Sequence, residues 1–97
     1  MKSIRFSWDD RKNLANQKKH KLSFEEAQSV FFDECATEYY DPDHLESENR
    51  FLMLGLSYQV RVLVVSYTFR EDEIEIRIIS GRRATKKEQK EYTGEKL

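Results

Sequence analysis

The sequence has little of what marks disulfide-rich, fibrous or membrane-spanning proteins. It contains one cysteine, one proline and three glycines in 97 residues. A single cysteine cannot form an internal disulfide and is typical of a reducing compartment, and so few prolines and glycines exclude collagen-like and low-complexity chains. The longest apolar stretches, Leu52–Leu56 and Val62–Val65, are far too short to span a bilayer. We therefore expect no membrane association.

Residues for metal or cofactor chemistry are also missing. His20, His44 and Cys35 give no ligand cluster at a usable spacing. The chain has no glycine-rich phosphate loop, and no motif of an activated nucleophile surrounds Cys35 or any serine. We expect neither a bound metal nor a cofactor, which narrows the enzyme classes open to this protein.

What is present indicates one folded domain over residues 1–97. A chain of 11.7 kDa is too short to build two separate cores. Aromatic residues make up 12% of the sequence and argue against disorder, while charged residues at 36% imply a strongly ionic surface. The N-terminal residues lack the apolar region of a signal peptide, so we expect a cytoplasmic protein.

The charges are segregated along the chain although the net charge is only −1. Residues 1–22 carry a net charge of +5, residues 23–49 carry −9 with no lysine or arginine, and residues 50–97 carry +3. Such segregation can place a basic surface opposite an acidic one, and a basic patch is the electrostatic footprint of phosphate binding. The alternative is an ordinary solvated surface on which the blocks cancel in the fold.

Hydrophobic periodicity predicts an α+β domain. The S-x-x-E pattern of Ser23–Glu26 and the T-x-x-E pattern of Thr85–Glu88 are capping boxes that begin helices. Together with an Asp-capped helix after Asp9, they give an N-terminal helical hairpin that turns at Lys21–Leu22, and a C-terminal helix that runs towards Tyr92. Period-two alternation predicts the strands Ser3–Ser7, Thr37–Tyr40, Arg50–Ser57, Val60–Phe69 and Asp72–Ser80. The order β-α-α-β-β-β-β-α indicates an antiparallel sheet with these helices packed around it.

Arginines on the predicted strands are the first candidates for chemistry. Arg61 and Tyr67 share the parity of a central strand and would project from its two ends on one side. Arg77 lies in the next strand, and Arg82 and Arg83 follow at its exit. Guanidinium groups on a rigid sheet suit bidentate phosphate recognition and stabilisation of charge in phosphoryl transfer. For any one of them, a surface ion pair with a neighbouring glutamate is the alternative.

His20 is the side chain near the basic hairpin whose ordinary pKa suits proton transfer at neutral pH. In metal-free RNA cleavage a base removes the 2′-OH proton, an acid protonates the leaving 5′ oxygen, and cations stabilise the charge on the phosphate. His20 could act as base or acid, with Lys18 and Lys19 beside it to attract RNA. A histidine at a helix end can equally be a C-terminal cap, and the spacing leaves both roles open.

These motifs together resemble the BrnT-type toxins. The first half contributes Phe6-Ser7-Trp8-Asp9, Lys12, Asn16, Lys19-His20, Ser23-Phe24-Glu25-Glu26-Ala27 and Val30-Phe31. The second half contributes Arg50, Gly55, Arg61-Val62-Leu63-Val64-Val65, Tyr67, Ile76-Arg77-Ile78-Ile79-Ser80, Arg82, Ala84, Glu88 and Tyr92. The chain departs from the family at Lys21, where the family usually has glycine, and at Gly81, where it often has alanine.

The resemblance implies a RelE-like ribonuclease fold and the toxin of a type II toxin–antitoxin module. It implies metal-independent RNA cleavage that halts translation and growth, and a DNA-binding, BrnA-like antitoxin that silences the toxin. On this hypothesis the catalytic residues are His20, Arg61, Tyr67, Arg77 and Arg82, and the RNA-binding residues are Lys18, Lys19 and Arg83. Arg61, Arg77 and Arg82 would hold the scissile phosphate, while His20 or Tyr67 would transfer protons.

A second hypothesis needs no chemistry. The protein would be a nucleic-acid or protein binding module, in which the acidic 33–48 segment and the polar C-terminal helix serve a partner. The sequence leaves open whether cleavage needs the ribosome and which RNA is preferred.

Overall fold

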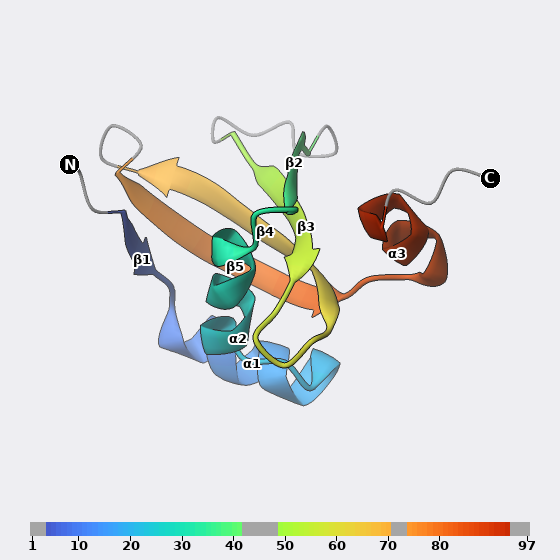
Figure 1. Cartoon of the computed structure of the whole chain (residues 1–97). Coiled ribbons are helices and arrows are strands. Elements are labelled where there is room, and N and C mark those ends of the chain that lie inside the picture. The colour runs from blue at the N-terminus through green and yellow to red at the C-terminus, as the bar shows by residue number, and fades with distance from the viewer. Residues whose placement is uncertain (1–3, 42–48, 71–73, 94–97) are drawn as a thin grey trace.

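The protein is described by a computed structural model that covers residues 4–41, 49–70 and 74–93 (Figure 1). Its elements follow the predicted order, with a single 3-10 turn, η1, added after the second helix. The helices are α1 (Asp10–His20), α2 (Phe24–Ser29) and α3 (Lys86–Thr93), and η1 spans Val30–Phe32. The strands are β1 (Arg5–Ser7), β2 (Thr37–Tyr40), β3 (Phe51–Leu56), β4 (Val62–Arg70) and β5 (Glu75–Arg83). No helix among these residues is both long and apolar enough to cross a membrane.

The five strands form one mixed sheet in the order β1-β5-β4-β3-β2. Strands β2 to β5 are antiparallel neighbours, but β1 lies parallel to β5, with Phe6 opposite Ile76. The prediction of an antiparallel sheet is therefore wrong at this edge. A tight hairpin turn dictates an antiparallel pair, whereas β1 reaches β5 from the other end of the chain. Its direction depends on where the helical hairpin packs, which strand periodicity does not encode.

The helical hairpin covers one face of the sheet, as Figure 1 shows below and in front of β4 and β5. Its turn, its second helix and the following η1 contribute the buried side chains Leu22, Phe24, Ala27 and Val30. They pack on the side chains that β4 and β5 turn towards them: Leu63, Val65, Tyr67, Ile76 and Ile78. This core fixes which face of each strand the helices cover. Trp8 is partly buried and packs against this core.

Helix α1 is held by hydrogen bonds rather than by an apolar stripe, because its buried residues are Asn13 and Asn16. The Asn16 amide donates to the Leu22 carbonyl (2.8 Å) and its oxygen accepts from the Gly81 N–H (3.2 Å). Asn13 accepts from the Phe24 N–H at 2.9 Å. Asn16 therefore provides a hydrogen-bond partner for the backbone of β5 at the part of its edge that the short β1 does not pair with. Helix α1 lies beside that edge.

The turn of the hairpin requires a left-handed residue. Lys21 ends α1 with φ 57° and ψ 41°, and its N–H donates to the Gln17 carbonyl at 3.0 Å. Glycine adopts this conformation at no steric cost, whereas a residue with a Cβ adopts it at a cost in free energy. This explains why glycine is the usual residue at this position of the family that the sequence resembles.

Among the described residues, the second face of the sheet is covered at one end, by α3. Leu54, Val64 and Ala84 form a small cluster there, and Tyr92 of α3 packs on it. No residue of α3 is fully buried. The helix is tied down instead by polar contacts: the Tyr92 hydroxyl donates to Asp33 at 2.6 Å, and Glu88 accepts two hydrogen bonds from Arg82.

Candidate functional site

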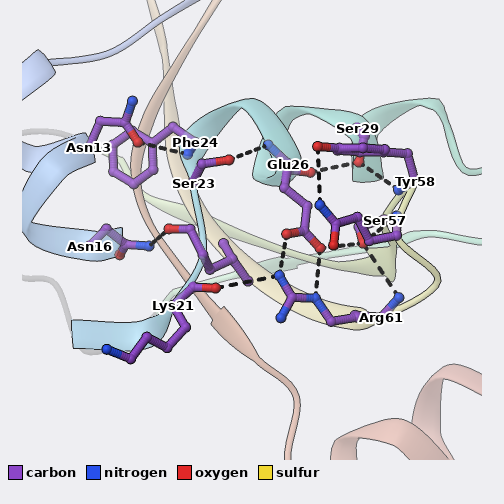
Figure 2. Close-up of polar contacts among 12 residues, drawn as sticks. Asn13, Asn16, Lys21, Ser23, Phe24, Glu26, Ser29, Ser57, Tyr58 and Arg61 are labelled. Atoms are coloured by element: carbon purple, nitrogen blue, oxygen red, sulfur yellow. Dashed lines mark hydrogen bonds and ion pairs between the residues drawn. The ribbon is translucent and has the colours of Figure 1, made fainter. Parts of the chain in front are cut away.

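The structure places the three predicted phosphate-binding arginines on different surfaces. Arg61 precedes β4 and is paired with Glu26 of α2, on the face covered by the helical hairpin (Figure 2). Arg77 alternates with the core residues Ile76 and Ile78, so it points to the opposite face. Arg82 lies on that opposite face too, against α3. Because the sheet separates Arg61 from Arg77 and Arg82, the three do not surround one phosphate.

Arg61 belongs to a half-buried polar network around Glu26. Its Nε donates to Glu26 at 2.9 Å, and its terminal nitrogen donates to the other carboxylate oxygen and to the Lys21 carbonyl. The Ser57 hydroxyl also donates to Glu26, at 2.7 Å. Burial opposes ionisation of this carboxylate, but Arg61 and Ser57 outweigh it and hold the pKa of Glu26 below its ordinary value. The network joins α2 to the β3–β4 turn (Figure 2).

Tyr67 lies inside the core, fully buried. Its ring packs edge-on against Phe31 at 4.9 Å, and its hydroxyl donates to Glu38 of β2. Burial, together with the negative charge of Glu38, raises the pKa of Tyr67 above its ordinary value. The hydroxyl therefore stays protonated at neutral pH, and it faces the hairpin side of the sheet, away from Arg77.

Arg82 is engaged by α3. Both terminal nitrogens donate to Glu88, at 2.8 and 2.9 Å. This pairing lowers the pKa of Glu88 to about 2 and raises the pKa of Arg82. Its neighbour Arg83 points the other way and contributes its charge to the environment of Glu26.

The remaining predicted residues lie at the end of α1. Lys18 and Lys19 are exposed and His20 is half-buried in the last helical turn. Eight residues of helix separate His20 from Lys12, which corresponds to roughly 12 Å along the axis.

Arg77 lines a small hollow of about 100 Å³ at the other end of the open face. Four cationic residues, Lys12, Arg50, Arg70 and Arg77, surround this hollow, and Asp9 is its one carboxylate among the described lining residues. We call this group the cationic hollow. It gathers positive charge from helix α1, from the entry to β3, from the end of β4 and from β5.

The fold positions each of these side chains. Thr68 and Arg77 are opposite each other in the β4–β5 pair, and Arg70 follows two residues after Thr68 on the same face. The Thr68 hydroxyl donates to the Asn49 carbonyl at 2.6 Å, which fixes the backbone immediately before Arg50. Asp9 caps α1 by accepting from the N–H groups of Arg11 and Lys12. These backbone hydrogen bonds lower the pKa of Asp9.

Among the predicted catalytic residues, Arg77 lines the cationic hollow and the other four do not. Sequence reasoning did not assign Lys12, Arg50 and Arg70 to the site. The alternation of side chains along β4 and β5 could have placed Arg70 and Arg77 on the same face of the sheet, because both lie near the connection between these two strands. Lys12 could not have been found that way, since α1 reaches the hollow only through its packing beside β5.

Residues 8–88 match the family model described as the ribonuclease toxin, BrnT, of a type II toxin–antitoxin system. The crystal structure of the Brucella abortus ribonuclease toxin BrnT is similar, with a TM-score of 0.63 and 19% sequence identity, over 87% of this chain and 100% of that chain. At this identity the structural likeness shows the fold. No curated protein gave a significant match.

Proposed function

The chain belongs to the BrnT family of ribonuclease toxins of type II toxin–antitoxin systems, and we propose that it cleaves RNA without a metal and thereby arrests translation and growth. The proposal includes a RelE-like ribonuclease fold, action in the cytoplasm and silencing by a cognate BrnA-like antitoxin that binds DNA. Family membership supports the reaction class and the existence of an antitoxin partner.

One observation carries the assignment of the active surface: the convergence of Lys12, Arg50, Arg70 and Arg77 on one hollow. A phosphodiester carries one negative charge in the ground state and gains a second as the 2′ oxygen attacks. Guanidinium groups fixed on neighbouring strands bind phosphate oxygens bidentately and stabilise that added charge. The hollow supplies the cations that metal-free cleavage needs.

We assign the roles accordingly. Lys12, Arg70 and Arg77 hold the scissile phosphate, and Thr68 and Asp9 position the strand and helix that carry them. Lys18, Lys19 and Arg83 attract the flanking RNA by charge. His20 lies roughly 12 Å from Lys12 along the helix axis, which is too far for proton transfer at a phosphate held in the hollow, so we place it with Lys18 and Lys19 as a contact to the flanking RNA. Arg61 and Tyr67 act as framework residues through Glu26 and Glu38.

The test is induction of the chain alone in a bacterium, with growth and total RNA followed in parallel. The Arg77→Ala variant removes a cation of the hollow, and Lys90→Ala removes one from the exposed side of α3 as a matched control. We expect growth arrest with new RNA ends for the wild-type chain and the control, and their loss in Arg77→Ala. Cleavage by the purified protein should persist in the presence of a chelator.

Three outcomes would count against the proposal. Equal cleavage by Arg77→Ala would remove the hollow from the active surface. Arrest without RNA ends would keep a toxin but discard this chemistry. RNA that is bound with strong salt dependence and left intact would favour the non-catalytic binding module.

A further inference from the structure

The outer edge of β2 is open to a further strand. In the sheet, β2 is the last strand, and no described residue pairs with its outer side (Figure 1). The Asp41 N–H donates to the Arg50 carbonyl at 2.9 Å, which makes Asp41 and Arg50 a hydrogen-bonded pair of the ladder. Because such pairs alternate along antiparallel strands, Glu38 and Tyr40 direct their N–H and C=O groups away from β3.

A groove on each face of the sheet reaches this edge, and the groove on the hairpin face extends across the sheet to Ile4 beside β1. On the hairpin face a cavity of about 430 Å³ is lined by Phe32, Met53, Phe69 and Ile4, with Glu38 as its only charged lining residue among those described. On the α3 face a cavity of about 260 Å³ is lined by Tyr39, Leu52, Leu54 and Val64, with Glu88 and Glu91 at its rim. Successive residues of an added strand would point alternately into the two grooves.

Large apolar side chains are exposed beside these grooves. Phe32, which lines the groove on the hairpin face, is 71% exposed, and Ile4, which lines the far end of that groove beside β1, is 54% exposed. Tyr40 is 57% exposed on β2 itself. A groove that contains exposed apolar groups and reaches a free strand edge is typical of a surface that a partner covers.

The charges at this edge specify the partner. Glu88 is already paired with Arg82. Within the described part of the chain, Glu38 and Glu91 have no ion-pair partner, and β2 contains no cation. A second copy of this chain would bring the same carboxylates to the shared edge without a cation to meet them. The edge therefore suits a partner strand that carries lysine or arginine together with apolar residues.

We propose that the antitoxin adds a β-strand to the outer edge of β2, with apolar side chains alternating into the two grooves and a basic side chain facing Glu38. This inference rests on the proposed toxin–antitoxin function for the identity of the partner. Backbone hydrogen bonds from Glu38 and Tyr40 give the affinity, and the grooves with their carboxylates give the specificity.

The test uses purified full-length chain and a short synthetic peptide that is rich in valine and carries one central lysine. A peptide with glutamate in place of lysine is the matched control. Tyr40→Pro removes an outward N–H without removing a β2–β3 hydrogen bond, since proline is tolerated at an edge whose N–H faces outward. Tyr40→Ala loses the same ring but keeps the N–H group.

We expect the lysine peptide to bind Tyr40→Ala only slightly more weakly than the wild-type chain, because the ring is lost while the outward N–H group is kept. Binding to Tyr40→Pro should be about tenfold weaker or worse, because one backbone hydrogen bond and the strand geometry are lost. Glu38→Gln, which keeps the backbone intact, should weaken the lysine peptide several-fold and serves as the second variant if Tyr40→Pro fails to fold. The amide signals of Glu38 and Tyr40 should shift on titration.

Equal binding by Tyr40→Pro and Tyr40→Ala would overturn the strand addition. Equal binding of the two peptides would overturn the charge assignment, and absence of binding at millimolar peptide would overturn the edge as a docking site. Peptide binding is measured without RNA cleavage, so the two proposals can fail separately. A chain that binds the peptide but does not cleave RNA would contradict the ribonuclease function alone. A chain that cleaves RNA but does not bind the peptide would contradict the docking edge alone.

Discussion

The guanidinium of Arg61 and the carboxylate of Glu26 form a two-point ion pair across the interface between α2 and the β3–β4 turn. The Glu26 side chain is only 2% exposed, while that of Arg61 is 23% exposed. The pair also lies between the two non-glycine residues with positive φ in the described chain, Lys21 (57°) and Val60 (61°). Arg61 directly follows Val60 and donates to the Lys21 carbonyl. A side chain that sequence parity marked as catalytic therefore stabilises two strained turns.

Removing Arg61 should destabilise the fold. Arg61→Ala leaves a buried carboxylate without its cation, and loss of one partner of such a pair costs roughly 3 kcal/mol. Urea unfolding followed by circular dichroism measures this directly. Glu26→Gln combined with Arg61→Ala should recover part of the lost free energy of unfolding, because the glutamine side chain left in the interface carries no charge. If Arg61→Ala unfolds at the wild-type urea concentration but loses cleavage, Arg61 is a catalytic residue after all.

Removing cations of the hollow should reduce RNA cleavage and leave stability nearly unchanged. We expect Arg77→Ala and Lys12→Ala each to lower the cleavage rate about 100-fold, the range found for loss of one electrostatic stabiliser of a transition state. Binding of uncleaved RNA should also become less sensitive to salt. Lys90→Ala is the control of equal charge change. A fall in rate that merely follows a fall in melting temperature would argue against a direct role.

The Arg82–Glu88 pair should make stability depend on acid pH. The pKa of Glu88 is about 2 in the folded protein and lies below its unfolded value, so between these two values the unfolded chain binds more protons. Stability from this pair is thus fully present above the unfolded pKa and is lost as pH falls towards 2. Thermal unfolding between pH 7 and pH 2 should show a shallower decline for Glu88→Gln than for wild type. Parallel curves would show that Glu88 contributes nothing.

Tyr92 should report on the docking of α3. Its hydrogen bond to Asp33 raises its pKa to about 12. A raised pKa means that the stabilisation is complete below the unfolded value and is lost as pH rises towards 12. Tyr92→Phe should lower the free energy of unfolding by about 1 kcal/mol at neutral pH. Ultraviolet titration of the wild-type and variant chains would test the assignment. The tyrosine that ionises with this raised pKa in the wild-type chain should be missing from Tyr92→Phe, and its persistence there would contradict the assignment.

The hairpin turn offers a stabilising substitution. Lys21 adopts the left-handed conformation with a Cβ present, so Lys21→Gly should raise the free energy of unfolding by about 1 kcal/mol. Lys18→Gly, in the last turn of the same helix, should lower it by up to about the same amount. Denaturant midpoints with unchanged slopes would measure both. Destabilisation by Lys21→Gly would show that the side chain makes a contact worth more than the backbone strain.

The two capping boxes show how far local pattern reaches. At α3 the box forms in full: the Glu88 N–H donates to the Thr85 hydroxyl, and the Thr85 N–H donates to Glu88. At α2 only half of it forms, because Ser23 accepts from the Glu26 N–H while the Glu26 carboxylate turns inward to Arg61. Both helices begin where the sequence predicts. The glutamate of the second box has a stronger partner that comes from a distant strand.

Local physics was enough for the order of elements, the helix starts, the turn at Lys21 and the apolar faces of β4 and β5, because each depends on residues a few positions apart. The tertiary structure alone decided the parallel direction of β1, the placement of Arg61 with Glu26, and the meeting of Lys12 with Arg77. Those relationships join segments that approach only after the hairpin packs on the sheet and the Asn16 amide bridges α1 to the edge of β5. Side-chain charge and spacing predicted a phosphate-binding surface; packing determined which cations lie together.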